Sequence, residues 1–230
     1  MSAEPVLTRY LFNKDTVFQQ LKLSIYDRDY KGSLFWAYEL YFSWYEKEVI
    51  DFLINILHRA FPHYKFLNEF LNDYYCEWNE ADIVDKPHQF IATIIRNLLI
   101  RNPKLPENKK QALFEIIEED IIEYYTVQIN LLKPLEIPAI KEDTPKSNKQ
   151  IKVIDSKSVP DFCDNWLYYA SRNPLWKYRI LQYKGTIDIK NKKVEFSNIW
   201  NREQFFEAFG YTIKDIPREI HKRCFILENS

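Results

Sequence analysis

The chain has 230 residues, of which 46% are hydrophobic and 17% aromatic, and its 32 lysines and arginines nearly balance its 33 aspartates and glutamates. These values are typical of a globular protein with one sizeable core or two small ones, and the net charge of -1 gives no overall attraction to nucleic acid or to a membrane. The three glycines, Gly32, Gly185 and Gly210, form no glycine-rich phosphate-binding motif. A dinucleotide-binding fold and a P-loop ATPase are therefore excluded.

The sequence carries no targeting signal that we can identify. Its first residues lack the basic and then apolar regions of a secretory signal, and no stretch of about 18 residues is apolar and uncharged. Cys76, Cys163 and Cys224 are far apart and form no C-x-x-C motif, which fits a reducing compartment. We therefore expect a cytoplasmic protein that has no membrane partner.

Helical periodicity dominates residues 1–132. Asn13 is expected to cap the first helix, while Gly32 is expected to lie in a turn before a second helix capped by Ser33. The expected helices cover 15–26, 34–42, 44–61, 65–78, 90–102 and 107–132. Short polar turns and prolines separate them, which predicts a mainly α fold with a stacked helical array, either solenoid-like or an irregular bundle.

The second half of the chain divides into a connecting segment and a small unit. Residues 133–160 contain four prolines and many charges but no aromatic side chain, so we predict a linker or a long loop. Residues 161–230 are expected to form a small helical unit, either independent or packed on the array. Alternating apolar residues on both sides of Asn191 predict a β-hairpin over 186–196, followed by a helix at 201–210 capped by Asn201.

We find no residue pattern that predicts catalysis or metal binding. His58 and His63 are five residues apart, but Pro62 breaks the helical register that would bring them together. Cys163 has no histidine close in sequence, and no G-x-S-x-G motif is present. We therefore expect no enzymatic activity, no cofactor and no metal site.

Two features predict a protein interface. Residues 35–45 contain seven aromatic side chains in eleven, more than one face of a helix can bury, so some are expected to be exposed and to contact a partner. The second feature is an acidic stripe within 115–123, which is either a solvated helix face or a docking stripe for a basic partner. The candidate interface residues are Trp36, Tyr41, Trp44, Tyr45, Glu115, Glu119 and Glu123.

A basic segment at 172–193 provides an alternative. It has seven basic residues and one acidic residue, interleaved with Trp176, Tyr178 and Tyr183. Basic and aromatic side chains together could bind RNA or DNA by phosphate contacts and base stacking, or the aromatics could simply form the core of the unit. The candidate nucleic-acid contacts are Arg172, Lys177, Arg179, Lys184, Lys190, Lys192 and Lys193.

Four blocks of the sequence carry a family resemblance: RYLFNKDTVFQQLKLSI, LFWAYELYFSWYEKEVIDFL, FIATIIRNLLIRNP and NPLWKYRILQYKGTIDIKNKKVEF. Together they resemble a family of uncharacterised proteins encoded by giant nucleocytoplasmic large DNA viruses. The resemblance implies a viral protein made in the host cytoplasm and working in or near a viral factory. It carries over no functional residue.

These patterns lead to two functional hypotheses. The first is a non-enzymatic helical scaffold or adaptor that binds viral or host proteins through aromatic and charged surface patches. The alternative is a nucleic-acid-binding accessory factor in viral transcription or translation that uses the basic segment.

Overall fold

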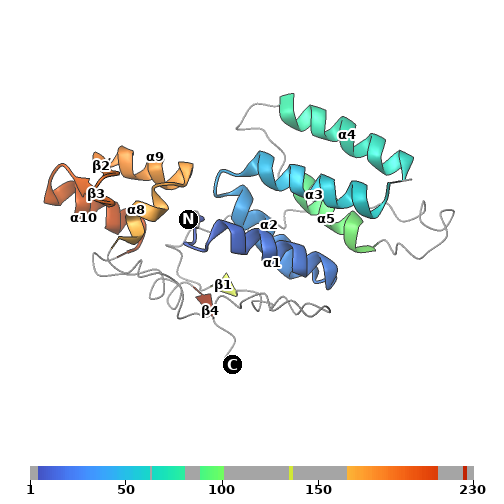
Figure 1. The fold of residues 1–230 in the computed structure, drawn as a ribbon, viewed down its shortest axis with the longest axis horizontal. Coiled ribbons are helices and arrows are strands. Elements are labelled where there is room, and N and C mark those ends of the chain that lie inside the picture. The colour runs from blue at the N-terminus through green and yellow to red at the C-terminus, as the bar shows by residue number, and fades with distance from the viewer. Residues whose placement is uncertain are drawn as a thin grey trace.

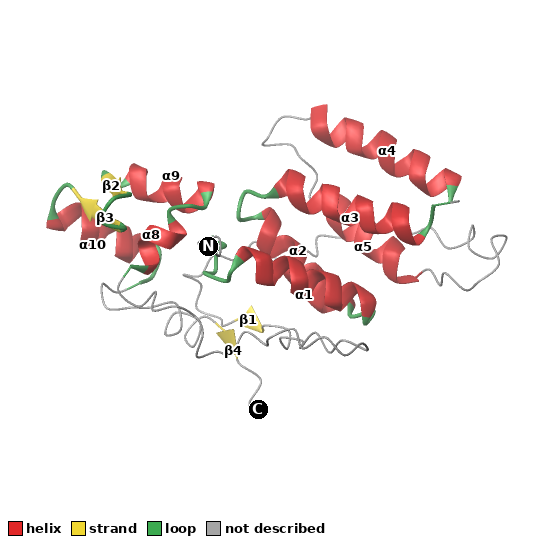
Figure 2. Cartoon of the chain, in the orientation of Figure 1, coloured by secondary structure: helices red, strands yellow, loops and turns green. Residues whose placement is uncertain are grey.

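The computed structural model describes residues 5–62, 64–80, 89–100, 135–136, 165–211 and 225–226. These residues are mainly helical, and the C-terminal part carries a two-stranded hairpin (Figure 1, Figure 2). The helices are α1 (Lys14–Tyr26), α2 (Tyr30–Tyr41), α3 (Glu46–Ala60), α4 (Lys65–Glu80), α5 (Gln89–Ile100), α8 (Trp166–Ala170), α9 (Pro174–Gln182) and α10 (Ile199–Ala208). The strands are β1 (Leu135–Glu136), β2 (Gly185–Asp188), β3 (Lys193–Phe196) and β4 (Phe225–Ile226). The predicted fold class is confirmed.

Side-chain caps fix the starts of α1 and α2. The side chain of Asn13 accepts the backbone N–H of Asp15 at 2.9 Å, so its predicted role as the N-cap of α1 is confirmed. The cap of α2 is Asp29 and not Ser33, since the Asp29 carboxylate accepts the N–H of Gly32 at 2.9 Å. Gly32 thus lies in the first turn of α2, where a Cβ would be only 2.4 Å from that carboxylate. The missing side chain makes this cap possible.

Helices α1 to α5 pack around one core. Helix α2 contacts α1, α3 and α5, and α5 is buried around nearly its whole circumference. Helix α4 lies along α3 in Figure 1 and contributes Leu67, Leu71 and Trp78 to the same core. Tyr74 of α4 packs edge-on against Phe90 of α5, with ring centroids 4.5 Å apart. An all-round apolar helix such as α5 requires neighbours on several sides, and the array supplies them.

The C-terminal unit forms a second core around Trp176. Trp176 lies on α9, and its indole is surrounded by Trp166 of α8, Phe205 of α10 and Tyr211, which follows α10. The predicted hairpin is confirmed: β2 and β3 are antiparallel and pair Asp188 with Lys193 at the turn. The predicted range was 186–196, and the observed hairpin covers 185–196. Helix α10 starts two residues earlier than expected, because Asn198 and not Asn201 provides the cap and accepts the N–H of Asn201 at 2.8 Å.

A short segment at residues 6–13, which we call the N-terminal turn, contributes to both cores. It folds back on itself, with the N–H of Thr8 bonded to the carbonyl of Phe12 at 2.8 Å and Leu11 in a left-handed conformation. Leu7 and Leu11 belong to the C-terminal core, whereas Tyr10 and Phe12 belong to the core of the array. The C-terminal unit is therefore packed on the array through this turn.

Several expected elements fall largely outside the described residues. These are the helix at 107–132, most of the linker at 133–160 and the first residues of the unit expected at 161–230. Of that linker, the structure describes β1, which pairs in parallel with β4, so that Leu135 lies opposite Phe225 and Glu136 opposite Ile226. The beginning of the segment thus makes a two-residue ladder with the end of the chain.

Candidate protein interface

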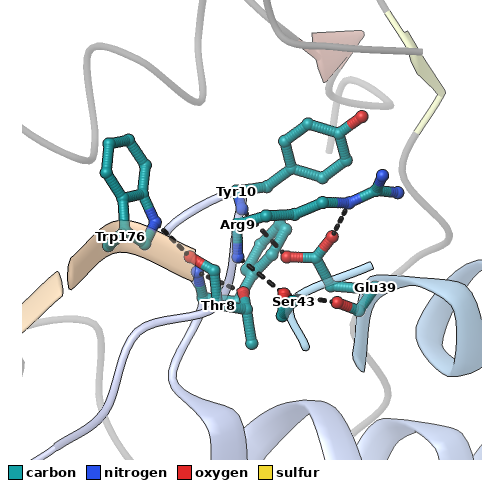
Figure 3. Close-up of polar contacts among 7 residues, drawn as sticks. Thr8, Arg9, Tyr10, Glu39, Ser43 and Trp176 are labelled. Atoms are coloured by element: carbon teal, nitrogen blue, oxygen red, sulfur yellow. Dashed lines mark hydrogen bonds and ion pairs between the residues drawn. The ribbon is translucent and has the colours of Figure 1, made fainter. Parts of the chain in front are cut away.

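A buried polar cluster connects the N-terminal turn to α2 (Figure 3). One carboxylate oxygen of Glu39 accepts the Nε–H of Arg9 at 3.0 Å, and the other accepts the N–H of Tyr10 at 3.0 Å. Ser43, just after α2, accepts the N–H of Arg9 at 2.7 Å and donates to the carbonyl of Glu39 at 2.5 Å. These bonds satisfy polar groups that the turn carries into the interior.

Burial dominates the electrostatics of this cluster. Desolvation raises the pKa of Glu39, while the guanidinium of Arg9, the hydroxyl of Thr8 and the N–H of Tyr10 act in the opposite direction. The Arg9 guanidinium also lies over the rings of Tyr10 and Phe42, at 4.4 and 4.9 Å from their centroids. Since the Glu39 side chain is fully buried, we interpret the cluster as structural.

On the surface nearby, Trp44 projects from the tight connection between α2 and α3. Its N–H bonds to the carbonyl of Tyr41 at 3.0 Å, and its φ of 66° is left-handed. This backbone geometry turns the indole away from the core, so that 43% of the residue is exposed. Trp44 is therefore the one predicted aromatic anchor that the structure leaves accessible among the four candidates.

Trp44 contacts Tyr178 of the C-terminal unit. The ring centroids are 5.4 Å apart and the planes are tilted by 44°. Tyr178 is 54% exposed, and Leu181, one turn further along α9, is 53% exposed. We call Trp44, Tyr178 and Leu181 the junction patch. It lies where the array meets the C-terminal unit, and each of these two parts has its own core.

The other aromatic anchors predicted from the sequence are core residues, which corrects that prediction. Trp36 is 1% exposed and packs edge-on against Phe12 at 5.3 Å. Tyr41 and Tyr45 are also buried, and burial raises the pKa of each to about 12. For Trp36 and Tyr41 the physical reason is that α2 has α1, α3 and α5 around it, so aromatic side chains on several of its faces are all covered.

The acidic candidates cannot be placed in the same way. Glu115, Glu119 and Glu123 lie outside the described residues, so the docking-stripe interpretation stays a prediction.

The basic candidates lie mostly on the surface of the C-terminal unit. The exposed ones are Arg172, Lys177, Lys184, Lys190, Lys192 and Lys193. Lys193 forms an ion pair with Glu195 across neighbouring positions of β3. Arg179 is partly buried, and its guanidinium lies over Trp176 and Phe209 at 4.9 and 4.6 Å. Arg179 is therefore a packing residue of this unit, contrary to its predicted role as a surface contact.

Of the three aromatic residues interleaved with the basic ones, two pack in the core and one is exposed. Trp176 is fully buried, and Tyr183 packs edge-on against Phe205 at 5.9 Å. Only Tyr178 among the three offers an exposed ring. A small unit needs its large apolar side chains for a core, and this requirement removes two of the three predicted stacking platforms.

The sequence interpretation missed the partnership of Trp44 with Tyr178 and Leu181. A signal was present in α9, where Trp176 and Ile180 form one apolar stripe and Tyr178 and Leu181 form another. Nine residues of helix with two apolar faces indicate that one face is either exposed or buried by another part of the chain. Ile199 and Trp200, at the start of α10, form a separate exposed apolar site.

The residues that the structure describes contain neither a metal site nor a membrane span. In these ranges no group of three or more histidine, cysteine, aspartate or glutamate side chains could hold a metal ion. The helices described here are too short or too polar to cross a bilayer.

Comparison with known proteins gives no matching family model, no similar curated protein and no similar solved structure.

Proposed function

We propose that this protein is a non-enzymatic helical scaffold or adaptor and that the junction patch is its docking surface for another protein. The observation that carries the proposal is the exposed contact between Trp44 and Tyr178, which come from the two packed units. Tryptophan and tyrosine dominate the energetics of protein interfaces. Anchors that are already held in place also lose little freedom on binding, which favours affinity.

The origin and location of the protein belong to the same proposal. The resemblance of four sequence blocks to proteins of giant nucleocytoplasmic DNA viruses supports a viral protein that acts in the host cytoplasm, at or near a viral factory. Its partners would then be other viral proteins or host proteins.

A second candidate function is nucleic-acid binding, and a specific observation favours it. Residues 165–211 contain eight basic and four acidic side chains, and six of the predicted basic contacts are exposed. RNA or DNA could bind along α9 and the hairpin, with Tyr178 as a stacking ring. We rank it second because Trp176 and Tyr183 are committed to the core.

The test is affinity purification of the tagged protein from cells that express it naturally, with and without nuclease. Three forms are compared: the unaltered protein, a Trp44→Asn/Tyr178→Ser variant and a Trp200→Ser control, which removes a more exposed aromatic elsewhere. Asparagine suits position 44 because it tolerates a left-handed backbone.

We expect a nuclease-resistant set of proteins that the double variant loses and the control retains. Recovery of the same proteins with all three forms would contradict a docking role for the junction patch. A partner set that disappears with nuclease would instead support the second candidate.

A further inference from the structure

The junction patch has positive charge on one side. Lys177 and Leu181 are four residues apart on α9 and share its surface, and both are exposed. Lys184 follows the end of α9, and its N–H donates to the carbonyl of Leu181 at 3.0 Å. Lys184 is also exposed, with a left-handed φ of 57°. The apolar centre of the patch is thus flanked by two lysines.

We propose that the segment docking on the junction patch is an acidic amphipathic α-helix of the partner protein. This inference rests on the proposed function and specifies the chemistry of the partner at the same site. Large apolar side chains of that helix would cover Trp44, Tyr178 and Leu181. Carboxylates beside its apolar stripe would face Lys177 and Lys184.

Charge complementarity is the reason for an acidic occupant. Residues 165–211, which include α9, have a net charge of +4, from eight basic and four acidic residues. Opposite charge at the rim of an apolar patch raises the rate of encounter and excludes basic competitors. An amphipathic helix presents apolar anchors at i, i+3, i+4 and i+7 with charges alongside. This pattern matches a narrow apolar centre with a charged border.

The same residues argue against a nucleic acid at this patch. Leu181 offers no aromatic face for a base. The rings of Trp44 and Tyr178 contact each other at 5.4 Å with planes tilted by 44°, so part of the surface of each ring is taken up by the other. Base stacking requires an open face, whereas an apolar side chain of a peptide needs only contact area.

The test uses two labelled helical peptides with the same leucine and phenylalanine stripe. One carries glutamate and the other carries lysine at all flanking positions. Binding to the full chain is measured by fluorescence anisotropy at low and at physiological salt. The variants are Lys177→Glu/Lys184→Glu and the matched control Lys190→Glu/Lys192→Glu, which makes the same charge change on the hairpin and likewise alters one exposed left-handed lysine.

We expect the acidic peptide to bind the unaltered protein and the lysine peptide to bind at least about tenfold more weakly. Reversal of Lys177 and Lys184 should exchange this preference, Trp44→Asn should weaken the acidic peptide, and the hairpin control should change the affinity less than about threefold. Equal binding of both peptides, no binding of the acidic one, or equal effects of the two charge reversals would overturn the inference.

A photo-crosslinking residue at position 181 separates this inference from the proposed function. A captured partner whose crosslinked segment is acidic and helical supports both. A partner captured through a basic or extended segment overturns the inference and leaves the adaptor function standing. Failure of any protein to crosslink at the patch, with capture of a labelled single-stranded oligonucleotide instead, overturns both.

Discussion

Trp176 donates its indole N–H to the backbone carbonyl of Thr8 at 3.0 Å, a hydrogen bond between the second helix of the C-terminal unit and the N-terminal turn (Figure 3). Both residues are buried. The same indole packs against Trp166 and Tyr211, with centroids 5.8 and 5.9 Å away. One side chain therefore connects the beginning of the chain to the core of its C-terminal unit.

The substitution Trp176→Phe tests this connection. It removes the indole donor and leaves the Thr8 carbonyl with the N–H of Leu11 as its remaining partner. We expect a loss of about 1–3 kcal/mol in the free energy of unfolding, from the buried hydrogen bond and the smaller ring. Urea unfolding followed by circular dichroism measures it. Trp200→Phe, on the surface, is the control and should change stability by less than about 0.5 kcal/mol. Equal effects of the two would show that the connection contributes no stability.

Substitution of Trp36 should lower the free energy of unfolding much more than substitution of Trp44. Trp36→Ala leaves a cavity in the core beside Phe12 and Phe35, and we expect it to cost about 3–5 kcal/mol. Trp44→Asn removes an exposed ring from a left-handed position that asparagine tolerates, so the cost should be less than about 1 kcal/mol. Chemical denaturation of both variants gives the comparison. A severe loss with Trp44→Asn would mean that the indole supports the fold and would invalidate it as a docking anchor.

The pair formed by Arg9 and Glu39 should show strong coupling. Either Arg9→Met or Glu39→Leu leaves a charged group in the interior without its partner, at a cost of about 3–5 kcal/mol. The double variant removes both charges and should cost clearly less than the sum of the single ones. A double-mutant cycle on the free energy of unfolding measures the difference. Additive losses would indicate that the two side chains do not depend on one another.

Stability should fall at alkaline pH, and Tyr45 provides a specific test. Burial raises the pKa of Tyr45 from 10.0 to about 12, so the folded state holds the phenol proton at pH values where the unfolded chain releases it. The stability from this group is fully present below pH 10 and is lost as the pH rises toward 12. Tyr45→Phe should therefore show a shallower decline of unfolding free energy above pH 10 than the unaltered protein. Parallel curves would contradict the assignment.

Much of the local structure is determined by the sequence. The helical periods, the Asn13 cap and the hairpin at 186–196 depend on residues that are close in the chain. Such local patterns can be read from the sequence without knowing the tertiary structure. The caps at Asp29 and Asn198 were missed even though they are local. In the first case the decisive feature was the space left by Gly32, which admits a carboxylate that any Cβ would displace.

Only the tertiary structure decided which aromatic residues are exposed. Trp36 and Trp44 belong to the same aromatic run, yet one is buried and the other is 43% exposed. The difference arises because three helices surround α2, whereas the turn after it carries Trp44 outward. The contact of Trp44 with Tyr178 likewise depends on how the N-terminal turn joins the two cores. Burial is set by the neighbours that the fold brings to a side chain, and residue type and local periodicity do not specify those neighbours.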